Sequence, residues 1–285
     1  MEKRKLKYFL LLMEFFLVFV FWGIIFYSNN QKLKVIFFDI GQGDAILIEK
    51  GSTQIIIDGG PDGSKMMEKL GKFVPFWDRK IEVVFATHPD ADHISGLVEV
   101  LENYEIGQLI DNSFESDSKV YKKYRETFQE KKISRLKGER GLEIKKEDMR
   151  MKIIYSATIN NVASKDSNSG SLVIRLDFGE NSFLFTGDFP IEKEELLLNQ
   201  KEDIEADVLK VSHHGSAYAS GEKFLEKVHP RDAIISVGKN NRYNHPAKEV
   251  LERLKKIGVG IVRTDESGDI EYDCSSQKEC FLFVK

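Results

Sequence analysis

The sequence predicts an α/β fold in which two β-sheets pack together and helices lie outside them. Three observations indicate this fold: short apolar runs typical of strands alternate with helical patterns, the same order recurs in the second half of the chain, and polar clusters follow the strands. No Pro- or Ser-rich linker separates the halves, so we expect one domain over 32–285. With 285 residues and 41% hydrophobic content, the chain can bury a sizeable core.

The chain begins with a short basic segment and a long apolar one. Residues 1–7 contain four Lys and Arg, and within 8–28 Glu14 is the only charged residue. A helix of about twenty residues rises roughly 30 Å, which is the thickness of a bilayer core. The run lacks the small residues of a signal-cleavage site. We therefore expect 8–28 to be a transmembrane signal anchor in the cell membrane, with 1–7 cytoplasmic and 32–285 extracytoplasmic.

Strand and helix patterns alternate through the first half of the domain. Three short β-branched runs separated by Gly-rich turns predict a strand meander over 33–40, 45–50 and 53–60. The nearly continuous apolar run at 81–88 predicts a strand buried on both faces. Apolar residues at helical spacing then predict a helix over 94–104.

The second half repeats this order and ends in a hairpin. Strands are expected at 151–156, 171–179, 182–188, 206–216 and 232–238, and helices at 190–200, 221–229 and 245–258. The segment 269–285 is expected to form a hairpin. Its two cysteines, Cys274 and Cys280, could close a small disulfide loop in an oxidising exterior.

The charge distribution does not by itself favour a nucleic-acid partner. The formal net charge is −4, and residues 1–28 contribute four basic and two acidic side chains, which leaves the remainder at −6. One stretch differs: 119–152 holds thirteen Lys and Arg against six Asp and Glu, with interleaved aromatic residues at Tyr121, Tyr124 and Phe128. This stretch could bind phosphates, or it could be a solvated helix whose aromatic side chains face the core.

Potential metal ligands gather where predicted strands end. One cluster lies in six positions after the buried strand, and further His and Asp residues follow other strands or open a helix: His88, Asp90, Asp92, His93, Asp58, Asp188, His213, His214 and His245. Of the six histidines, only His229 lies elsewhere. Singly, such residues shape turns or cap helices. Together, without nearby cysteines, they indicate a pair of divalent ions, because a carboxylate can bridge two ions that activate water.

These motifs resemble a known family. The segment "THPDADHISG" matches the H-x-[HD]-x-D-H signature of the metallo-β-lactamase superfamily. In the same order, "FFDIGQGDAILIE", "IIIDGG", "SFLFTGD", "ADVLKVSHHGS" and "RYNHP" resemble the extracytoplasmic hydrolase domain of ComEC competence proteins. The phosphorylcholine esterases of Gram-positive cell surfaces have a related outline. The resemblance implies a four-layer αββα sandwich with a dinuclear centre along the sheet edge.

The resemblance also implies the ligands of two divalent ions, Zn²⁺ or Mn²⁺. They are His88, Asp90, Asp92, His93, Asp188 and His214. The first two would bind one ion, the next two the other, and Asp188 would bridge them, with His214 as a direct ligand.

Four further residues would act beside the metals. The family implies that His213 completes the other metal or contacts substrate, and that His245 is a proton donor or a partner of the substrate phosphate. Asp58 and Asp39 are expected to orient the ligand loop without binding the metals themselves.

The chain departs from hydrolytic β-lactamases at two places. Asp90 replaces the middle histidine, and Asn168 and Ser169 stand where those enzymes have a histidine, so the site is rich in oxygen ligands. We expect a membrane-anchored, outward-facing hydrolase of phosphodiesters, a ComEC-like nuclease acting on DNA, with a separate channel protein as a partner. The alternatives are a phosphorylcholine or teichoic-acid esterase, a lactone, thioester or lactam hydrolase, and a non-enzymatic metal-stabilised surface domain.

Overall fold

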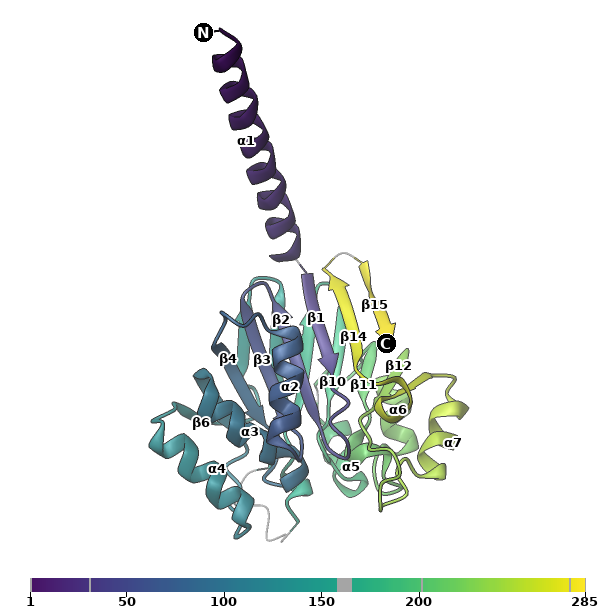
Figure 1. Ribbon diagram of the computed structural model, residues 1–285. Helices are drawn as coiled ribbons and strands as arrows, with labels where there is room; N and C mark the ends of the chain where they lie inside the picture. Colours follow the sequence, from purple (N-terminus) through teal and green to yellow (C-terminus); the bar gives the residue numbers. More distant parts are fainter. Residues whose placement is uncertain (1, 31, 158–165, 201, 277, 285) are drawn as a thin grey trace.

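The computed structural model describes residues 2–30, 32–157, 166–200, 202–276 and 278–284. Its first element is helix α1 (Glu2–Asn30), which projects from the remainder of the chain (Figure 1). Among the described residues, no helix combines the length and the apolarity that crossing a membrane requires. The transmembrane anchor predicted at 8–28 is therefore not supported by the structure.

The first sheet has eight strands in the order β15-β14-β1-β2-β3-β4-β5-β6. Neighbouring strands from β3 to β6 run parallel, and the other pairs are antiparallel. The strands are β1 (Lys32–Phe37), β2 (Ala45–Lys50), β3 (Thr53–Gly59), β4 (Lys80–Ala86), β5 (Glu105–Asp111), β6 (Arg135–Lys137), β14 (Ile270–Ser275) and β15 (Lys278–Val284).

The second sheet has seven strands in the order β13-β12-β11-β10-β9-β8-β7. Strands β10 to β13 run parallel, and the remaining pairs are antiparallel. The strands are β7 (Glu143–Lys146), β8 (Met149–Tyr155), β9 (Val173–Phe178), β10 (Asn181–Phe185), β11 (Val208–Lys210), β12 (Asp232–Ile235) and β13 (Gly260–Arg263).

Helices cover the outer face of each sheet (Figure 1). One apolar cluster joins the first sheet to α2 (Gly63–Phe73), α3 (Ala91–Asn103) and α4 (Lys119–Glu130). Another joins the second sheet to α5 (Ile191–Leu198), α6 (Glu222–Val228) and α7 (Lys248–Lys256). The short helix α8 (Thr264–Ser267) follows β13. The elements thus form the layers helix, sheet, sheet, helix, and the expected α/β fold with two packed sheets is confirmed.

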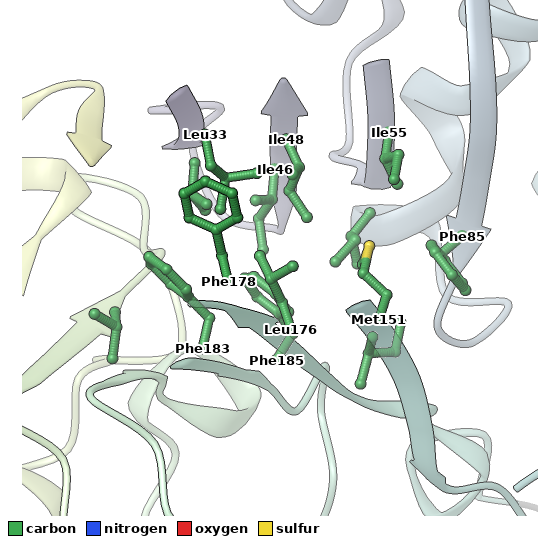
Figure 2. Close-up of a cluster of buried hydrophobic side chains, with 14 of the residues drawn as sticks. Leu33, Ile46, Ile48, Ile55, Phe85, Met151, Leu176, Phe178, Phe183 and Phe185 are labelled. Atoms are coloured by element: carbon green, nitrogen blue, oxygen red, sulfur yellow. The ribbon is translucent and has the colours of Figure 1, made fainter. Parts of the chain in front are cut away.

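The inner faces of the two sheets form a third apolar core. Figure 2 shows Ile46, Ile48 and Ile55 of the first sheet pointing toward Leu176 and Phe183 of the second. Strand β3 is buried along its whole length because helices lie on one side of it and the second sheet on the other. This burial on both faces explains why the predicted strands read as continuous apolar runs.

Two open interpretations are settled by the structure. Tyr121, Tyr124 and Phe128 on α4 are buried in the core, so the aromatic residues of 119–152 pack inward rather than forming a phosphate-binding surface. Cys274 and Cys280 form a disulfide that joins β14 to β15, which is the loop closure considered for the predicted hairpin.

Candidate metal centre

The predicted ligands lie at one edge of the sandwich because the strands that carry them run parallel. Strands β3 and β4 pair in parallel, as do β10, β11 and β12, so their carboxyl ends meet at the same edge. His88 follows β4, and α3 places Asp92 and His93 in its first turn. Asp188 follows β10, and His214 lies in the 3-10 turn Ser212–Gly215 after β11.

Two glycines set the depth of helix α3 in the site. A Cβ atom on Gly96 would lie 1.9 Å from the carbonyl oxygen of Gly59 at the end of β3. The Gly96 N–H also donates to the Gly60 carbonyl across 2.9 Å. Only glycine permits this approach of helix to strand, which brings Asp92 and His93 down to the strand ends.

Asp188 is the centre of the cluster. Its Oδ1 atom lies 3.3 Å from Nε2 of His93 and 3.7 Å from Nε2 of His214. Its Oδ2 atom lies 3.8 Å from Nε2 of His88 and 3.7 Å from Nε2 of His213. One buried carboxylate therefore faces four imidazoles, two on each oxygen.

The remaining two predicted aspartate ligands, Asp92 and Asp90, each lie beside one of these histidines. Asp92 Oδ2 lies 3.4 Å from His214 Nε2, and one ligand atom each from Asp92, His93, Asp188 and His214 all lie within 4.8 Å of one another. Asp90 Oδ2 lies 3.9 Å from Nε2 of His88. The structure thus brings together all six residues predicted as metal ligands.

The outer ring nitrogens of three histidines are held by neighbouring groups. His93 Nδ1 lies 2.8 Å from Asp58 Oδ2, and His214 Nδ1 lies 2.9 Å from the Ser236 carbonyl. Thr87 Oγ1 donates to Asp58 Oδ2 across 2.7 Å, so it can accept from His88 Nδ1 at 3.0 Å. When an ion binds, each Nδ1 can keep the proton and Nε2 can offer its lone pair. Without an ion, the surrounding carboxylates outweigh burial, raise the pKa of His93 well above its ordinary value and raise that of His214 to about 9, so metal binding would displace a proton from each of these rings.

The Nε2 atoms fit metal ions well. Those of His88, His93 and His214 are buried without a hydrogen-bond partner among the described residues, as is Oδ1 of Asp188. Buried polar atoms without partners are costly, and a divalent cation would satisfy them together. Imidazole nitrogens beside several carboxylate oxygens form a donor set that suits Zn²⁺ or Mn²⁺.

The charges of the cluster oppose the effect of burial. Burial disfavours the ionised form of Asp188, but His214 and His93 outweigh it and hold the pKa of Asp188 well below its ordinary value. Burial also disfavours the ionised form of Asp92, but the attraction of the nearby His214 and His93 outweighs it and lowers the pKa of Asp92 to about 2. Burial, together with the nearby His93, lowers the pKa of His88 to about 4. At neutral pH the carboxylates are therefore ionised and His88 is neutral, the forms in which both bind metals.

Asp58 and Asp39 have different surroundings. Asp58 is buried, accepts the Thr87 N–H across 2.8 Å and has a φ of 58°, a backbone conformation that costs energy outside glycine. Its contact with His93 matches the predicted orienting role. The carboxylate of Asp39 instead contacts the Gly41 N–H at 3.4 Å and Lys65 Nζ at 3.7 Å, so no described contact joins it to the ligand loop.

Asp44 and Lys210 belong to this centre, although the sequence patterns did not single them out. Asp44 Oδ1 lies 3.3 Å from Nδ1 of His214, and Asp44 Oδ2 forms an ion pair with Lys210 Nζ. Both side chains are buried. Two sequence features could have identified them. Asp44 directly precedes an apolar strand, and Lys210 interrupts the apolar run before the "SHHGS" histidines.

Two segments border the ligands. Ser167 Oγ donates to Asp90 Oδ1, so the segment expected to replace a histidine contacts Asp90 through Ser167 rather than through Asn168 or Ser169. His245 lies with its ring centroid 5.8 Å from that of His213. Burial and the nearby His213 lower the pKa of His245 to about 4.

A comparison with known protein families agrees with this geometry. The model described as "Metallo-beta-lactamase superfamily" matches residues 38–146 and 161–239, which is more than half of the chain. This chain belongs to the metallo-β-lactamase superfamily. Members of the superfamily are generally metal-dependent hydrolases.

Curated relatives of this metallo-β-lactamase chain include Competence protein ComA of Neisseria gonorrhoeae, which is 24% identical over 85% of this chain and 32% of its own length. ComE operon protein 3 of Bacillus subtilis is 32% identical over 95% of this chain and 37% of its own length. Recombination protein 2 of Haemophilus influenzae is 31% identical over 81% of this chain and 28% of its own length. The resemblance predicted from the motifs is confirmed, and the chain spans about a third of the length of these relatives.

Solved structures share the fold. The metallo-β-lactamase fold protein YhfI from Bacillus subtilis superposes with a TM-score of 0.53 at 12% identity, covering 90% of this chain and all of YhfI. At this identity the likeness concerns the arrangement of sheets and helices alone.

Proposed function

We propose that this metallo-β-lactamase domain is a dinuclear phosphodiesterase that cleaves nucleic acid. The observation that carries the proposal is the convergence of three unpartnered Nε2 atoms on the single buried carboxylate of Asp188. A structural role alone would leave these polar atoms unsatisfied in the core, at a cost that a bound cation removes.

The geometry supports a division of the ligands between two ions. Asp92, His93 and His214 surround Oδ1 of Asp188 and would hold one ion. His88, Asp90 and His213 lie on the side of Oδ2 and would hold the other. In this arrangement Asp188 would bridge the two ions, and His213 would take the first of its two predicted roles.

The ligand set favours a phosphodiester over a lactam. Three aspartates contribute to it, and hard oxygen ligands suit Mn²⁺ as well as Zn²⁺. Such ions, when bound in pairs, activate water and neutralise charge on the attacking and leaving oxygens.

The protein's own groups would orient the substrate and move protons. His245 is half-buried, and its Nδ1 atom lacks a hydrogen-bond partner among the described residues. At neutral pH its lowered pKa makes the ring neutral, so an N–H can donate to a phosphoryl oxygen. An anionic phosphodiester beside the ring would favour the imidazolium form, which can protonate the leaving alkoxide.

We also propose that the domain works outside the cell and associates with a membrane through α1. The described side chains from Tyr8 to Phe21 include many large apolar groups that are exposed, such as Phe15 at 74%. The disulfide between Cys274 and Cys280 suits an oxidising exterior. Fractionation and protease treatment of intact cells test this location. Full-length chain in the soluble fraction, or a domain protected from external protease, would overturn it.

Metal analysis combined with a substrate panel tests the enzymatic proposal. The purified chain is loaded with Mn²⁺ or Zn²⁺ and assayed on single-stranded DNA, duplex DNA and a phosphocholine ester. We expect cleavage of DNA by the wild type, loss of cleavage and of bound metal in Asp92→Ala, and neither loss in Asp117→Ala, whose carboxylate is fully exposed and pairs with Lys122.

The same panel, extended by a lactone and a thioester, separates the alternatives. Cleavage of the phosphocholine ester alone would indicate that the metal site belongs to a phosphorylcholine esterase and not to a nuclease. Cleavage of a lactone or thioester without any phosphodiester would contradict the phosphodiesterase proposal. Bound metal without activity on any of these substrates would favour a metal-stabilised binding domain.

A further inference from the structure

The loop 238–246, which ends in the cis peptide before Pro246, is built by its own hydrogen bonds. Asn241 Oδ1 accepts from the backbone N–H groups of Tyr243 at 3.1 Å and His245 at 3.0 Å. Asn241 Nδ2 donates to the carbonyls of His245 at 2.6 Å and Gly238 at 3.0 Å. The loop therefore presents its remaining side chains in a defined arrangement.

Tyr243 is the aromatic side chain that this loop exposes beside the metal centre. Its ring lies nearly parallel to that of His245, with centroids 5.7 Å apart and planes inclined by 25°. Half of the residue is open to solvent, at 50% exposure. His245 in turn lies beside His213, whose Nε2 faces Asp188. The rings of His213, His245 and Tyr243 therefore lead from the metal centre to an exposed aromatic surface.

Two cations accompany this ring. Arg242 Nη2 donates to Tyr243 Oη across 2.6 Å, and its guanidinium carbon lies 4.9 Å from the ring centroid. Lys239 and His245 line an open cavity of about 660 Å³ on the same loop, and its lining also includes Asp265 and Glu266, which are both paired with Arg263. In the part of the chain that the structure describes, neither Lys239 nor Arg242 forms an ion pair with a carboxylate, so both charges are available to an anionic ligand.

We propose that Tyr243 is a stacking platform for a nucleobase next to the scissile phosphate, and that Arg242 and Lys239 bind the flanking phosphates. The inference rests on the proposed phosphodiesterase function and narrows its substrate to single-stranded nucleic acid. A base offers a free π-face only when it is unpaired and unstacked, whereas in a duplex both faces are covered by neighbouring base pairs. Aromatic stacking beside a basic surface is the way in which proteins bind single strands without reading their sequence.

Kinetics of Tyr243 variants test the platform. Two substrates are compared, a short single-stranded oligonucleotide and methyl p-nitrophenyl phosphate, which has no nucleobase. In Tyr243→Leu we expect the ratio of kcat/KM for the oligonucleotide to kcat/KM for the small diester to fall about tenfold, mainly through a higher KM for the oligonucleotide. Tyr243→Phe retains the ring and is expected to keep the ratio. Trp77→Leu, which removes an exposed aromatic side chain on the loop between α2 and β4, is the matched control.

An abasic substrate identifies the contact. Removing the base beside the scissile phosphate is expected to lower kcat/KM of the wild type about tenfold and to leave Tyr243→Leu unaffected, because that variant has already lost the stacking. An equal effect of the abasic site on both proteins would overturn the platform.

Binding without cleavage provides a readout that does not depend on activity. With EDTA present, the Kd for a fluorescent oligothymidylate is measured over a range of salt concentrations. We expect Tyr243→Leu to raise Kd about tenfold, and Arg242→Gln to reduce the salt slope by about one. An unchanged Kd and ratio in Tyr243→Leu, with DNA cleavage intact, would overturn this inference alone. Wild type that cleaves neither substrate would overturn the proposed function, and this inference with it.

Discussion

His93 Nδ1 lies 2.8 Å from Oδ2 of Asp58, a buried residue with φ of 58° at the end of the neighbouring strand. This contact fixes the ring so that Nε2 points at Asp188, 3.3 Å away. Second partners of this kind orient metal-binding histidines and raise their basicity.

Asp58→Asn should therefore weaken metal binding by 10- to 100-fold, an effect typical of such partners. Asparagine tolerates the positive φ, so the backbone can stay in place. Metal affinity measured by competition with a chelator checks this expectation. Asp39→Asn is the matched control, since that carboxylate contacts only Gly41 and Lys65 among the described residues. Equal metal affinity in Asp58→Asn and the wild type would contradict the assigned role.

The pair of Asp44 and Lys210 predicts a large loss of stability when one partner is removed. Both side chains are buried, and Lys210→Met would leave the Asp44 carboxylate with only histidines beside it, at a cost of about 3–5 kcal/mol. Urea unfolding in EDTA measures the change without a metal contribution.

Lys50→Met is the control for this pair. Lys50 is as buried as Lys210, but its partners Glu147 and Asp148 are largely in solvent, with 54% and 35% side-chain exposure. They can regain water when the lysine is lost, so the change in unfolding free energy should stay far below that of Lys210→Met. Adding Asp44→Asn to Lys210→Met should recover part of the loss. Equal losses in the two single lysine variants would refute this account.

The contact between Gly96 and Gly59 predicts that a single methyl group displaces α3. In Gly96→Ala the new Cβ would meet the Gly59 carbonyl, so we expect a loss of about 1–3 kcal/mol of stability and weaker metal binding. Gly71→Ala on α2 is the control, because nothing lies within 4 Å of a Cβ there. It should stabilise the chain by about 0.5–1 kcal/mol. Thermal unfolding and metal titration of both variants decide the point.

Glu194 gives a pH dependence that is separate from the metal centre. Burial raises the pKa of Glu194 to about 7, although its carboxylate accepts the Gly221 N–H. A raised pKa stabilises the fold below the unfolded value near 4.5, and this stabilisation is lost as the pH rises through 7. Relative to Glu194→Gln, the wild type should therefore lose about 3 kcal/mol of unfolding free energy between pH 5 and pH 8. A stability difference that stays constant over this range would show that Glu194 titrates normally.

The sequence patterns located most strands but not the turns that carry chemistry. The apolar runs at 45–50 and 53–60 predicted β2 and β3 almost to the residue, because burial on both faces imposes such runs. The strand expected over 206–216 is shorter, since the chain leaves the sheet after Lys210. His213 and His214 there adopt φ of 50° and 53°, and a residue pattern does not reveal such strained turns.

The candidate site was predictable where its residues stand at strand ends, and less so where they meet across the sandwich. His88, Asp92 and His93 were identifiable from their spacing after a buried strand. Asp44 and Lys210 are 166 positions apart in the sequence and come together only because the two sheets pack face to face. Helix α2 was also not predicted, because its buried face includes only Met66 and Leu70.

The metal content of Asp188→Asn tests the central claim, a dinuclear centre bridged by one carboxylate. Wild type and variant are loaded with Mn²⁺ or Zn²⁺, freed of excess metal and analysed by mass spectrometry for metal per chain. The account predicts two ions per chain in the wild type. It predicts weaker metal binding and fewer than two ions per chain in Asp188→Asn, with the circular dichroism spectrum of a folded protein. Wild type that retains no metal, or a variant that retains two ions, would contradict it.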